Sequence, residues 1–197
     1  MLPPLPLIHW KKAFRERAKA LRSDAAKRQP SAAKFAASYF MGALEPKEGQ
    51  AVALYHPVGD ELDTAHLAAA LAEAGAAVLL PVVETKNAPL IFRLFEIDKP
   101  LVKGRYGIME PSGEAERRRP DIVVTPLLAV RPDGARLGMG GGYYDRTLAA
   151  LREEGEVTAI GYGYAAQMAD RFPVGPEDQF LDGFVSEQGY KAFARRR

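Results

Sequence analysis

The chain has 197 residues, of which 47% are hydrophobic and 26% are charged, so it favours one folded domain over a disordered chain. The 27 Lys and Arg residues nearly balance the 25 Asp and Glu residues, and this overall charge does not indicate a nucleic-acid-binding protein. The absence of cysteine excludes disulfides, thiolate metal sites and a cysteine nucleophile.

The N-terminal segment combines a proline-rich start with a helical pattern. Residues 1–9 contain three prolines and are expected to form an extended arm. Apolar residues recur at helical spacing over residues 10–21, which predicts a helix. Beside this apolar stripe runs a basic stripe, which is either a solvated face or a set of cations that reach an anionic ligand. Its members are Lys11, Arg15, Lys19 and Arg22.

The next segment predicts a β-α-β unit. A helix is expected over residues 31–44 with Ser31 as its N-cap, followed by a buried strand over residues 51–55. A loop over residues 56–63 leads to a helix capped by Thr64 and closed by Gly75. Another strand follows at residues 78–83, and the two strands should run parallel because a helix connects them.

The remaining pattern completes an α/β protein. Residues 90–95 and 106–109 indicate less regular strands, and residues 122–125 and 157–160 indicate buried strands. A helix is predicted over residues 143–153. The alternation of strands and helices predicts a single α/β domain over residues 1–197 with a mostly parallel sheet.

A glycine-rich loop at residues 138–142 precedes the helix at residue 143. Four of its five residues are glycine, which lets the backbone approach a phosphate without a Cβ clash. The N-terminus of the following helix adds a partial positive charge, so the loop suits an anion. The alternative is a tight strand-to-helix turn without a ligand. The loop is neither a Walker A motif, because no Gly-Lys-Ser/Thr follows, nor a dinucleotide fingerprint.

Two charged residues flank this loop. Arg136 precedes it and can supply a guanidinium charge to a phosphate. Asp145 lies in the first helical turn, where a carboxylate either compensates the helix dipole or binds the Mg²⁺ that accompanies a nucleotide.

Four sequence blocks together resemble the 5-formyltetrahydrofolate cyclo-ligase family over about residues 10–185. The most specific block is Arg136-Leu-Gly-Met-Gly-Gly-Gly-Tyr-Tyr-Asp-Arg146, preceded by Thr125-Pro-Leu-Leu-Ala-Val130 and Asp133-Gly134. The others are Lys11-Lys-Ala-Phe-Arg15, Tyr55-His-Pro-Val-Gly-Asp-Glu61-Leu-Asp-Thr64 and Gly107-Ile-Met-Glu110-Pro111.

The resemblance implies an ATP- and Mg²⁺-dependent enzyme that cyclises 5-formyltetrahydrofolate to 5,10-methenyltetrahydrofolate and releases ADP and phosphate. Phosphorylation would turn the formyl oxygen into a leaving group, and N10 of the folate would then attack the same carbon. The implied fold is a three-layer α/β/α sheet similar to the sugar-phosphate isomerase and CoA-transferase group.

The resemblance also assigns roles to single residues. It implies that Arg136, Lys11 and Arg15 are catalytic and bind ATP together with the glycine-rich loop. The implied ATP-binding residues are Lys11, Arg15, Arg136, Leu137, Gly138, Met139, Gly140, Gly141, Gly142, Tyr143 and Tyr144. The implied substrate-binding residues are His56, Glu61, Tyr143 and Tyr144, and the implied Mg²⁺ ligands are Asp145 and Asp178.

Structural roles without a ligand remain as alternatives for several of these residues. Glu61 holds the folate or compensates the dipole of the helix at Thr64. Tyr143 and Tyr144 either stack on an aromatic ring of a ligand or pack. The pair Tyr162 and Tyr164 is interpreted as strand-end packing, whereas Gln167 is a candidate for facing the nucleotide.

Two arginine runs, residues 117–119 and 195–197, are interpreted as solvated, although the first could meet a polyglutamate tail. The histidines at positions 9, 56 and 66 lack the spacing of a zinc site.

The expected partners are the small molecules 5-formyltetrahydrofolate and ATP, and no nucleic acid is expected. No membrane is expected either, because no apolar run reaches the roughly 18 residues of a membrane span. A cytoplasmic monomer or weak homodimer is expected. Two other functions stay open: a non-catalytic nucleotide- or folate-binding regulator of the same fold, and a phosphosugar isomerase. Retention of Lys11, Arg15, Arg136 and Asp145 favours the enzyme over the regulator.

Overall fold

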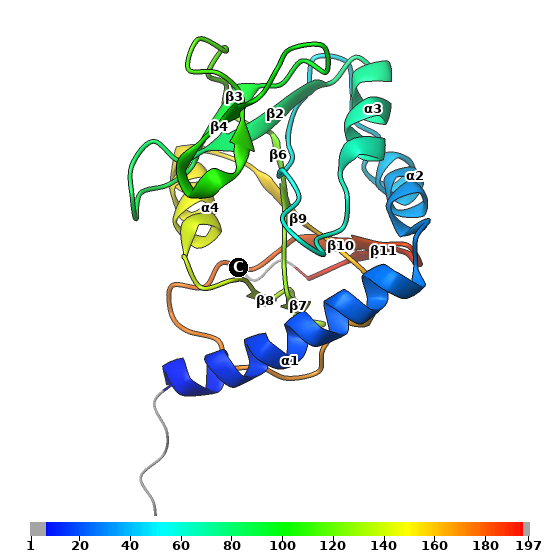
Figure 1. Cartoon of the computed structure of the whole chain (residues 1–197), viewed down its shortest axis with the longest axis vertical. Helices are drawn as coiled ribbons and strands as arrows, with labels where there is room; N and C mark the ends of the chain where they lie inside the picture. The colour runs from blue at the N-terminus through cyan, green and yellow to red at the C-terminus, as the bar shows by residue number, and fades with distance from the viewer. Residues whose placement is uncertain (1–6, 195–197) are drawn as a thin grey trace, which may run out of the picture.

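A mostly parallel sheet forms the centre of the computed structural model, which describes residues 7–194 and the side chains from residue 12 onward (Figure 1). Within these residues the sheet has seven strands in the order β11-β10-β9-β6-β1-β2-β3. Neighbouring strands from β10 to β2 run parallel, and the edge strands β11 and β3 run antiparallel to their neighbours. The strands are β1 (Ala51–Ala53), β2 (Ala77–Val82), β3 (Ile91–Leu94), β6 (Ile122–Thr125), β9 (Thr158–Tyr162), β10 (Gly183–Ser186) and β11 (Gly189–Ala192). The predicted α/β class with a mostly parallel sheet is therefore confirmed.

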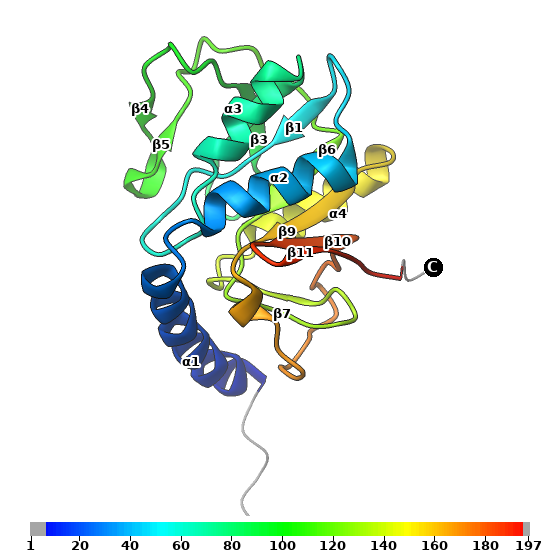
Figure 2. The same ribbon diagram turned by 90° about the vertical axis from the view of Figure 1, so that its right-hand side faces the viewer.

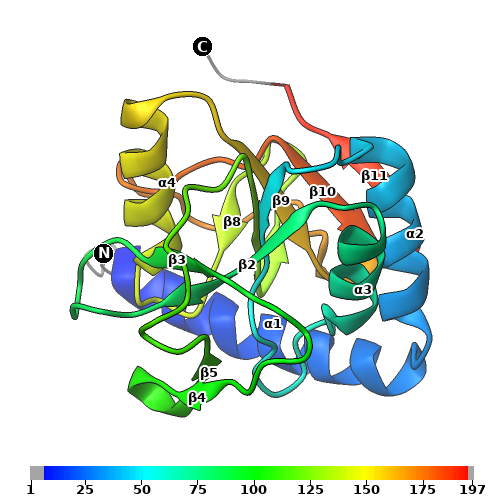
Figure 3. The same ribbon diagram turned by 90° about the horizontal axis from the view of Figure 1, so that it is seen from above.

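Helices cover both faces of this sheet (Figure 3). Helices α2 (Ala32–Leu44) and α3 (Ala65–Glu73) lie on one face, and α4 (Tyr143–Glu154) lies on the other. Alternate strand residues point to opposite faces, so Val52 packs with the α2 and α3 side while Ala51 and Val123 pack with the α4 side. The two hydrophobic clusters on either side of the sheet make the three-layer arrangement.

Helix α1 (Leu7–Arg28) is longer than the predicted helix at both ends. Residues 7–9, which were expected to be extended, are helical, and the rest of the predicted arm, residues 1–6, lies outside the described residues. The correction arises because no proline lies between residues 7 and 29, so nothing in residues 7–9 interrupts helical hydrogen bonding.

The predicted N-caps are right in position but wrong in chemistry. Ser31 and Thr64 occupy the N-cap positions of α2 and α3, yet neither side chain makes a capping hydrogen bond. The buried Thr64 hydroxyl donates instead to the carbonyl oxygen of Tyr55, and Asp63 Oδ1 accepts from the Ala65 amide at 2.7 Å. Gly75, with φ +76°, follows the end of α3 as predicted.

Short elements after β3 and β6 depart from the predictions. The segment expected as a strand over residues 106–109 begins with the turn η1 (Arg105–Gly107), in which Tyr106 adopts φ +66°, a value incompatible with a strand. This turn joins strands β4 (Val102–Lys103) and β5 (Met109–Glu110). After β6, strands β7 (Ala129–Val130) and β8 (Arg136–Leu137) form a second hairpin that the sequence did not predict.

Helix α1 lies beyond the carboxyl ends of the parallel strands (Figure 2). It packs through Ala18 against Leu128 and Leu137 of the segment that follows β6. It also contacts the short turn η2 (Ala165–Gln167), which follows β9. Ligands of open α/β sheets bind beyond the carboxyl ends of the strands, so α1 borders the expected place for a site. Among the described helices, none combines the length and apolar character needed to cross a bilayer.

Candidate active site

Two contacts made by α1 define the candidate site. Arg15 Nε donates to the carbonyl oxygen of Gly138 in the glycine-rich loop at 2.9 Å. Two helical turns further on, Arg22 Nη1 donates to Glu61 Oε1 at 3.3 Å in the loop that follows β1. Helix α1 therefore contacts both the glycine-rich loop and the loop that carries Glu61, which are far apart in the chain.

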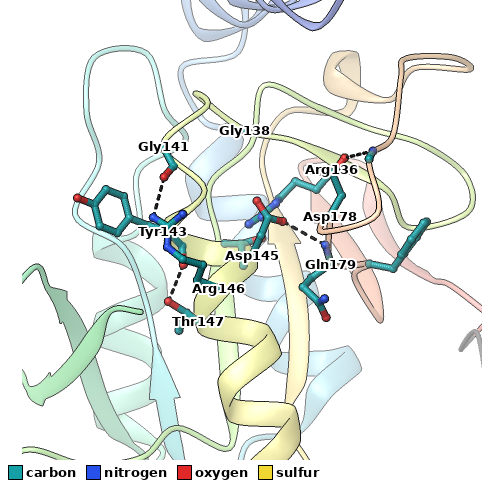
Figure 4. Close-up of polar contacts among 12 residues, drawn as sticks. Arg136, Gly138, Gly141, Tyr143, Asp145, Arg146, Thr147, Asp178 and Gln179 are labelled. Atoms are coloured by element: carbon teal, nitrogen blue, oxygen red, sulfur yellow. Dashed lines mark hydrogen bonds and ion pairs between the residues drawn. The ribbon is translucent and has the colours of Figure 1, made fainter. Parts of the chain in front are cut away.

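The glycine-rich loop requires glycine at two positions. Gly140 and Gly142 have φ values of +102° and +66°, and Gly142 is the N-cap residue of α4. A Cβ on Gly140 would lie 3.2 Å from Cζ of Arg15, so the arginine head lies directly against the loop backbone. Arg146 Nη2 donates to the Gly141 carbonyl oxygen at 2.8 Å (Figure 4). Two cationic side chains, Arg15 from α1 and Arg146 from α4, thus contact the loop where α4 begins.

Arg136 and Asp145 form an ion pair beside the loop (Figure 4). Arg136 Nη2 and Asp145 Oδ1 are 2.7 Å apart, and the Arg136 side chain is only 3% exposed. The guanidinium also lies over the ring of Tyr144, with Cζ 5.4 Å from the centroid. Its Nε is buried and has no hydrogen-bond partner among the described residues.

The two predicted metal ligands come from neighbouring segments. The backbone amide of Gln179 donates to Asp145 Oδ1 at 3.1 Å, which brings the segment carrying Asp178 against the start of α4 (Figure 4). Asp178 Oδ2 accepts from the Gly175 amide at 2.7 Å. No cluster of three or more metal-ligating side chains occurs among residues whose side chains are described.

Glu61 is held on both carboxylate oxygens. Oε1 accepts from Arg22, and Oε2 accepts from the Val58 amide at 3.0 Å. Burial raises the pKa of Glu61, while the Val58 amide and Arg22 act in the opposite direction. The alternative role as a helix-dipole partner falls to Asp63, whose carboxylate accepts from the first turn of α3.

Two tyrosines at the start of α4 have different surroundings. Burial raises the pKa of Tyr144, and the Glu61 carboxylate raises it further. The hydroxyl groups of Tyr143 and Tyr106 are 2.8 Å apart, and their rings meet edge to face with centroids at 6.1 Å. This hydrogen bond lowers the pKa of Tyr143 and raises that of Tyr106. Tyr144 is therefore near enough to Glu61 to respond to its charge, whereas Tyr143 faces the η1 turn.

The remaining predicted site residues are less constrained by contacts. His56 is half-buried in the loop after β1, and Met139 is 58% exposed. The Leu137 side chain is buried under α1, so only its backbone remains for a phosphate. The Lys11 backbone belongs to α1, but its side chain lies outside the described residues.

One interpretation of the sequence is wrong, and another is incomplete. Gln167 is buried and does not face an open site, because its side-chain Oε1 accepts from the Tyr164 amide at 2.7 Å and its Nε2 donates to the Leu127 carbonyl oxygen at 2.6 Å. Arg117 and Arg119 are exposed, as predicted for a solvated run, but Arg118 and Arg119 also donate to the carbonyl oxygens of Gly49 and Leu151 at 2.6 and 3.0 Å. The long arginine side chains reach backbone carbonyl groups that are distant in the sequence. The spacing of residues along the chain cannot reveal such contacts. The other run, residues 195–197, lies outside the described residues.

The pair Tyr162 and Tyr164 is buried, as the packing interpretation predicted. Sequence reasoning missed Arg146 and Tyr106 as neighbours of the loop. Arg146 ended the most specific block, and its position one turn into the helix was an available signal. Nothing local in the sequence indicated Tyr106, which reaches Tyr143 through tertiary structure.

Comparisons with known proteins identify relatives of this chain. The 5-formyltetrahydrofolate cyclo-ligase from Escherichia coli K12 is 36% identical over 140 residues, which cover 68% of this chain and 76% of that protein. The cyclo-ligase from Mycolicibacterium smegmatis is 36% identical over 143 residues, covering 66% of this chain and 70% of the relative.

Solved structures give the same result. The 5,10-methenyltetrahydrofolate synthetase of Aquifex aeolicus superposes with a TM-score of 0.77 at 28% identity, covering 95% of this chain and 94% of that one. The corresponding protein from Mycoplasma pneumoniae, at 23% identity and a TM-score of 0.67, supports the fold. A sequence model of the 5-formyltetrahydrofolate cyclo-ligase family matches residues 7–187. The chain is therefore an enzyme that belongs to the 5-formyltetrahydrofolate cyclo-ligase family.

Proposed function

We propose that this enzyme uses ATP and Mg²⁺ to cyclise 5-formyltetrahydrofolate to 5,10-methenyltetrahydrofolate, with release of ADP and phosphate. The observation that carries the proposal is the convergence of Arg15 and Arg136 on opposite ends of the glycine-rich segment. Glu61 lies across the same site, in electrostatic contact with Tyr144. Cations and the backbone amides at a helix N-terminus suit the phosphates, and a carboxylate suits the folate.

The ATP phosphates are assigned to the glycine-rich loop and the N-terminus of α4. Backbone amides and the helix dipole favour an anion there, and the glycines allow close approach. Arg15 reaches the loop from α1, and Arg136 supports its other end. Lys11 lies one turn before Arg15 on α1, so both can serve the same phosphate group.

The side chains present fit a magnesium ion that is shared with the nucleotide. Mg²⁺ is usually held by one or two carboxylates together with phosphate oxygens and water. Both hydrogen bonds to Asp145 end on Oδ1, and Oδ2 receives none from the described residues. Asp145 and Asp178 are therefore proposed to hold the ion. When bound, it would neutralise phosphate charge.

The folate is assigned to the side of the site that contains Glu61. A carboxylate can accept from the adjacent N–H donors of a pterin edge. Its two oxygens are held in one orientation by Arg22 and the Val58 amide. Tyr144 and His56 are proposed to line the same side, and Tyr143 the boundary with the nucleotide.

The chemistry needs positioning and charge stabilisation rather than a protein nucleophile. The γ-phosphorus of ATP forms a bond to the formyl oxygen, and the bond between the γ-phosphorus and the oxygen that remains on ADP breaks. N10 then attacks the formyl carbon and loses its proton to solvent, and the carbon–oxygen bond breaks to release inorganic phosphate. Arg15 and Arg136 stabilise the charge that spreads over the transferred group.

Oxygen labelling tests this route. 5-Formyltetrahydrofolate carrying ¹⁸O in the formyl group is converted with unlabelled ATP, and the phosphate released is analysed by mass spectrometry. The proposal predicts that the label appears in inorganic phosphate. Label that appears only in water would show that the formyl oxygen leaves without phosphorylation, and the proposed route would be abandoned.

A further inference from the structure

We propose that Arg22 is a positioning residue that holds the Glu61 carboxylate in place for the folate. The inference rests on the proposed function, because it assigns Glu61 to the folate side of the site. Arg22 belongs to α1, 39 residues before Glu61, and no sequence block that carries the family resemblance includes it.

The geometry is that of a built support rather than a chance surface pair. The Arg22 and Glu61 side chains are only 9% and 10% exposed, and Nη1 is 3.3 Å from Oε1. Oε2 is held separately by the Val58 amide at 3.0 Å. One oxygen is therefore fixed by the loop itself and the other by α1, so loss of Arg22 frees the carboxylate to rotate.

The charge balance at Glu61 also depends on Arg22. The titratable groups in electrostatic contact with Glu61 come from three elements: Arg22 from α1, Tyr55 from the end of β1, and Tyr144 from α4. Arg22 is the only cation in this set of described groups. Burial raises the pKa of Glu61 and Arg22 opposes that rise, so removing Arg22 favours the protonated carboxyl group.

Helix α1 joins this support to the nucleotide side. Arg15 and Arg22 are seven residues apart, about two helical turns, and therefore lie on the same face. Arg15 contacts Gly138 while Arg22 contacts Glu61, so one helix contacts both loops. Glu61, the proposed partner of the folate, is thus positioned by helix α1, which lies outside the loop that carries Glu61.

The test measures steady-state kinetics of Arg22→Gln, Arg22→Lys and Lys19→Gln in the full chain. Lys19 lies on the same helix and pairs only with Glu16 at the surface among the described residues, so Lys19→Gln controls for loss of one positive charge on α1. Arg22→Gln should raise KM for 5-formyltetrahydrofolate about tenfold or more, since a hydrogen bond to a charged group is lost, with the ATP KM within twofold of wild type. Arg22→Lys should recover part of the loss. Folate and ATP KM values that rise together, or no recovery with lysine, would assign Arg22 a merely structural role.

A double-mutant cycle separates positioning from other effects. If Arg22 acts through Glu61, adding Arg22→Gln to Glu61→Gln should change the folate KM by less than twofold. Additive losses would overturn the proposal. The acid limb of kcat/KM for the folate should also move to higher pH in Arg22→Gln, and an unmoved limb counts against it.

Failure of the two proposals can be told apart. A wild-type enzyme that cyclises the folate while Arg22→Gln keeps a wild-type folate KM refutes only the role of Arg22. A folded wild-type enzyme without ATP-dependent turnover refutes the proposed function. Calorimetric titration with the folate then decides Arg22: equal affinity in wild type and Arg22→Gln refutes its role, and selective loss supports it.

Discussion

Arg136 is nearly buried, and its guanidinium contacts Asp145 on one side and the ring of Tyr144 on the other. Its Nε has no partner among the described residues, which leaves a buried donor beside the glycine-rich loop. An unpaired buried donor is costly in a folded protein. This one side chain therefore links the ion pair, the loop and the proposed reaction.

Replacement of Arg136 should impair chemistry. Arg136→Ala is expected to lower kcat by on the order of 10²–10³, as for loss of one preorganised charge-stabilising donor. Initial rates at saturating ATP and folate measure the effect, with Lys19→Gln as the control and the far-ultraviolet circular dichroism spectrum as a check of folding. A folded Arg136→Ala enzyme that retains kcat within about threefold of wild type would contradict the assignment.

The raised pKa of Glu61 predicts a pH dependence of folate binding. If the ionised carboxylate accepts from the folate, affinity is lost as the pH falls through the Glu61 pKa, and burial moves this loss to a higher pH than for a free glutamate. Glu61→Gln should weaken folate binding on the order of tenfold at neutral pH and remove this pH dependence, while ATP binding persists.

Calorimetric titration with each ligand at several pH values compares wild type with Glu61→Gln. The substrate's own ionisations affect both proteins equally, so the difference isolates residue 61. Equal folate affinities in the two proteins would refute the role of Glu61.

The basic stripe shows how far single residues can be predicted. Helical spacing correctly predicted that Arg15 and Arg22 share a face, because periodicity depends only on local geometry. It could not separate them from Lys19, which pairs with Glu16 at the surface. The partners of Arg15 and Arg22 are distant in the chain, so only the fold distinguishes a supporting cation from a solvated one.

At the scale of elements, the start of α4 is the most constrained part of the site. Gly142 adopts φ +66° as N-cap, and a Cβ there would lie 2.6 Å from Arg146 Nη1. Arg146 in turn donates to the Gly141 carbonyl oxygen and lies over the ring of Tyr143. The loop conformation and the arginine therefore depend on the absence of a side chain at Gly142.

A methyl group at Gly142 should destabilise both the backbone and this contact. Gly142→Ala is expected to cost about 1–2 kcal/mol in the free energy of unfolding, from the left-handed conformation alone. It should also raise the ATP KM because the loop amides shift. Urea unfolding and kinetics measure the two effects.

Gly42 in α2 provides the matched control. It has no positive φ and no atom within 4 Å of an added Cβ, so Gly42→Ala should be neutral or stabilise by up to about 1 kcal/mol. If Gly142→Ala were as stable and active as Gly42→Ala, the loop would not depend on the conformation described.

Elements with strong local patterns were predicted well. The strand over residues 122–125 matches β6, and the helix predicted to start at Tyr143 matches α4, because a buried apolar run and a glycine-rich boundary are local signals. The hairpin β7–β8 and the turn η1 were missed, since their short strands pair through tertiary contacts. Thr64 was assigned the wrong bond because the alternative acceptor, the Tyr55 carbonyl, becomes a neighbour only after folding.

At the scale of the whole molecule, the sheet order brings the site together. Strands β1 and β2 precede β6 and β9 in the sequence, yet β6 lies directly beside β1 in the sheet. The loop after β1, which carries Glu61, is thereby brought next to the segment after β6, which leads to Arg136 and the glycine-rich loop. Strand order is a long-range property, so the sequence predicted the class of the fold while the position of α1 beyond the strand ends came from the structure.

The most direct test of the central claim is optical. The purified enzyme is mixed with 5-formyltetrahydrofolate, Mg²⁺ and ATP, and the near-ultraviolet absorbance of the methenyl product is followed beside an ATP-free control. We predict a rise in absorbance that requires ATP and is strongly slowed in Arg136→Ala. A flat trace from folded wild-type protein, or a rise that is independent of ATP, would contradict the account.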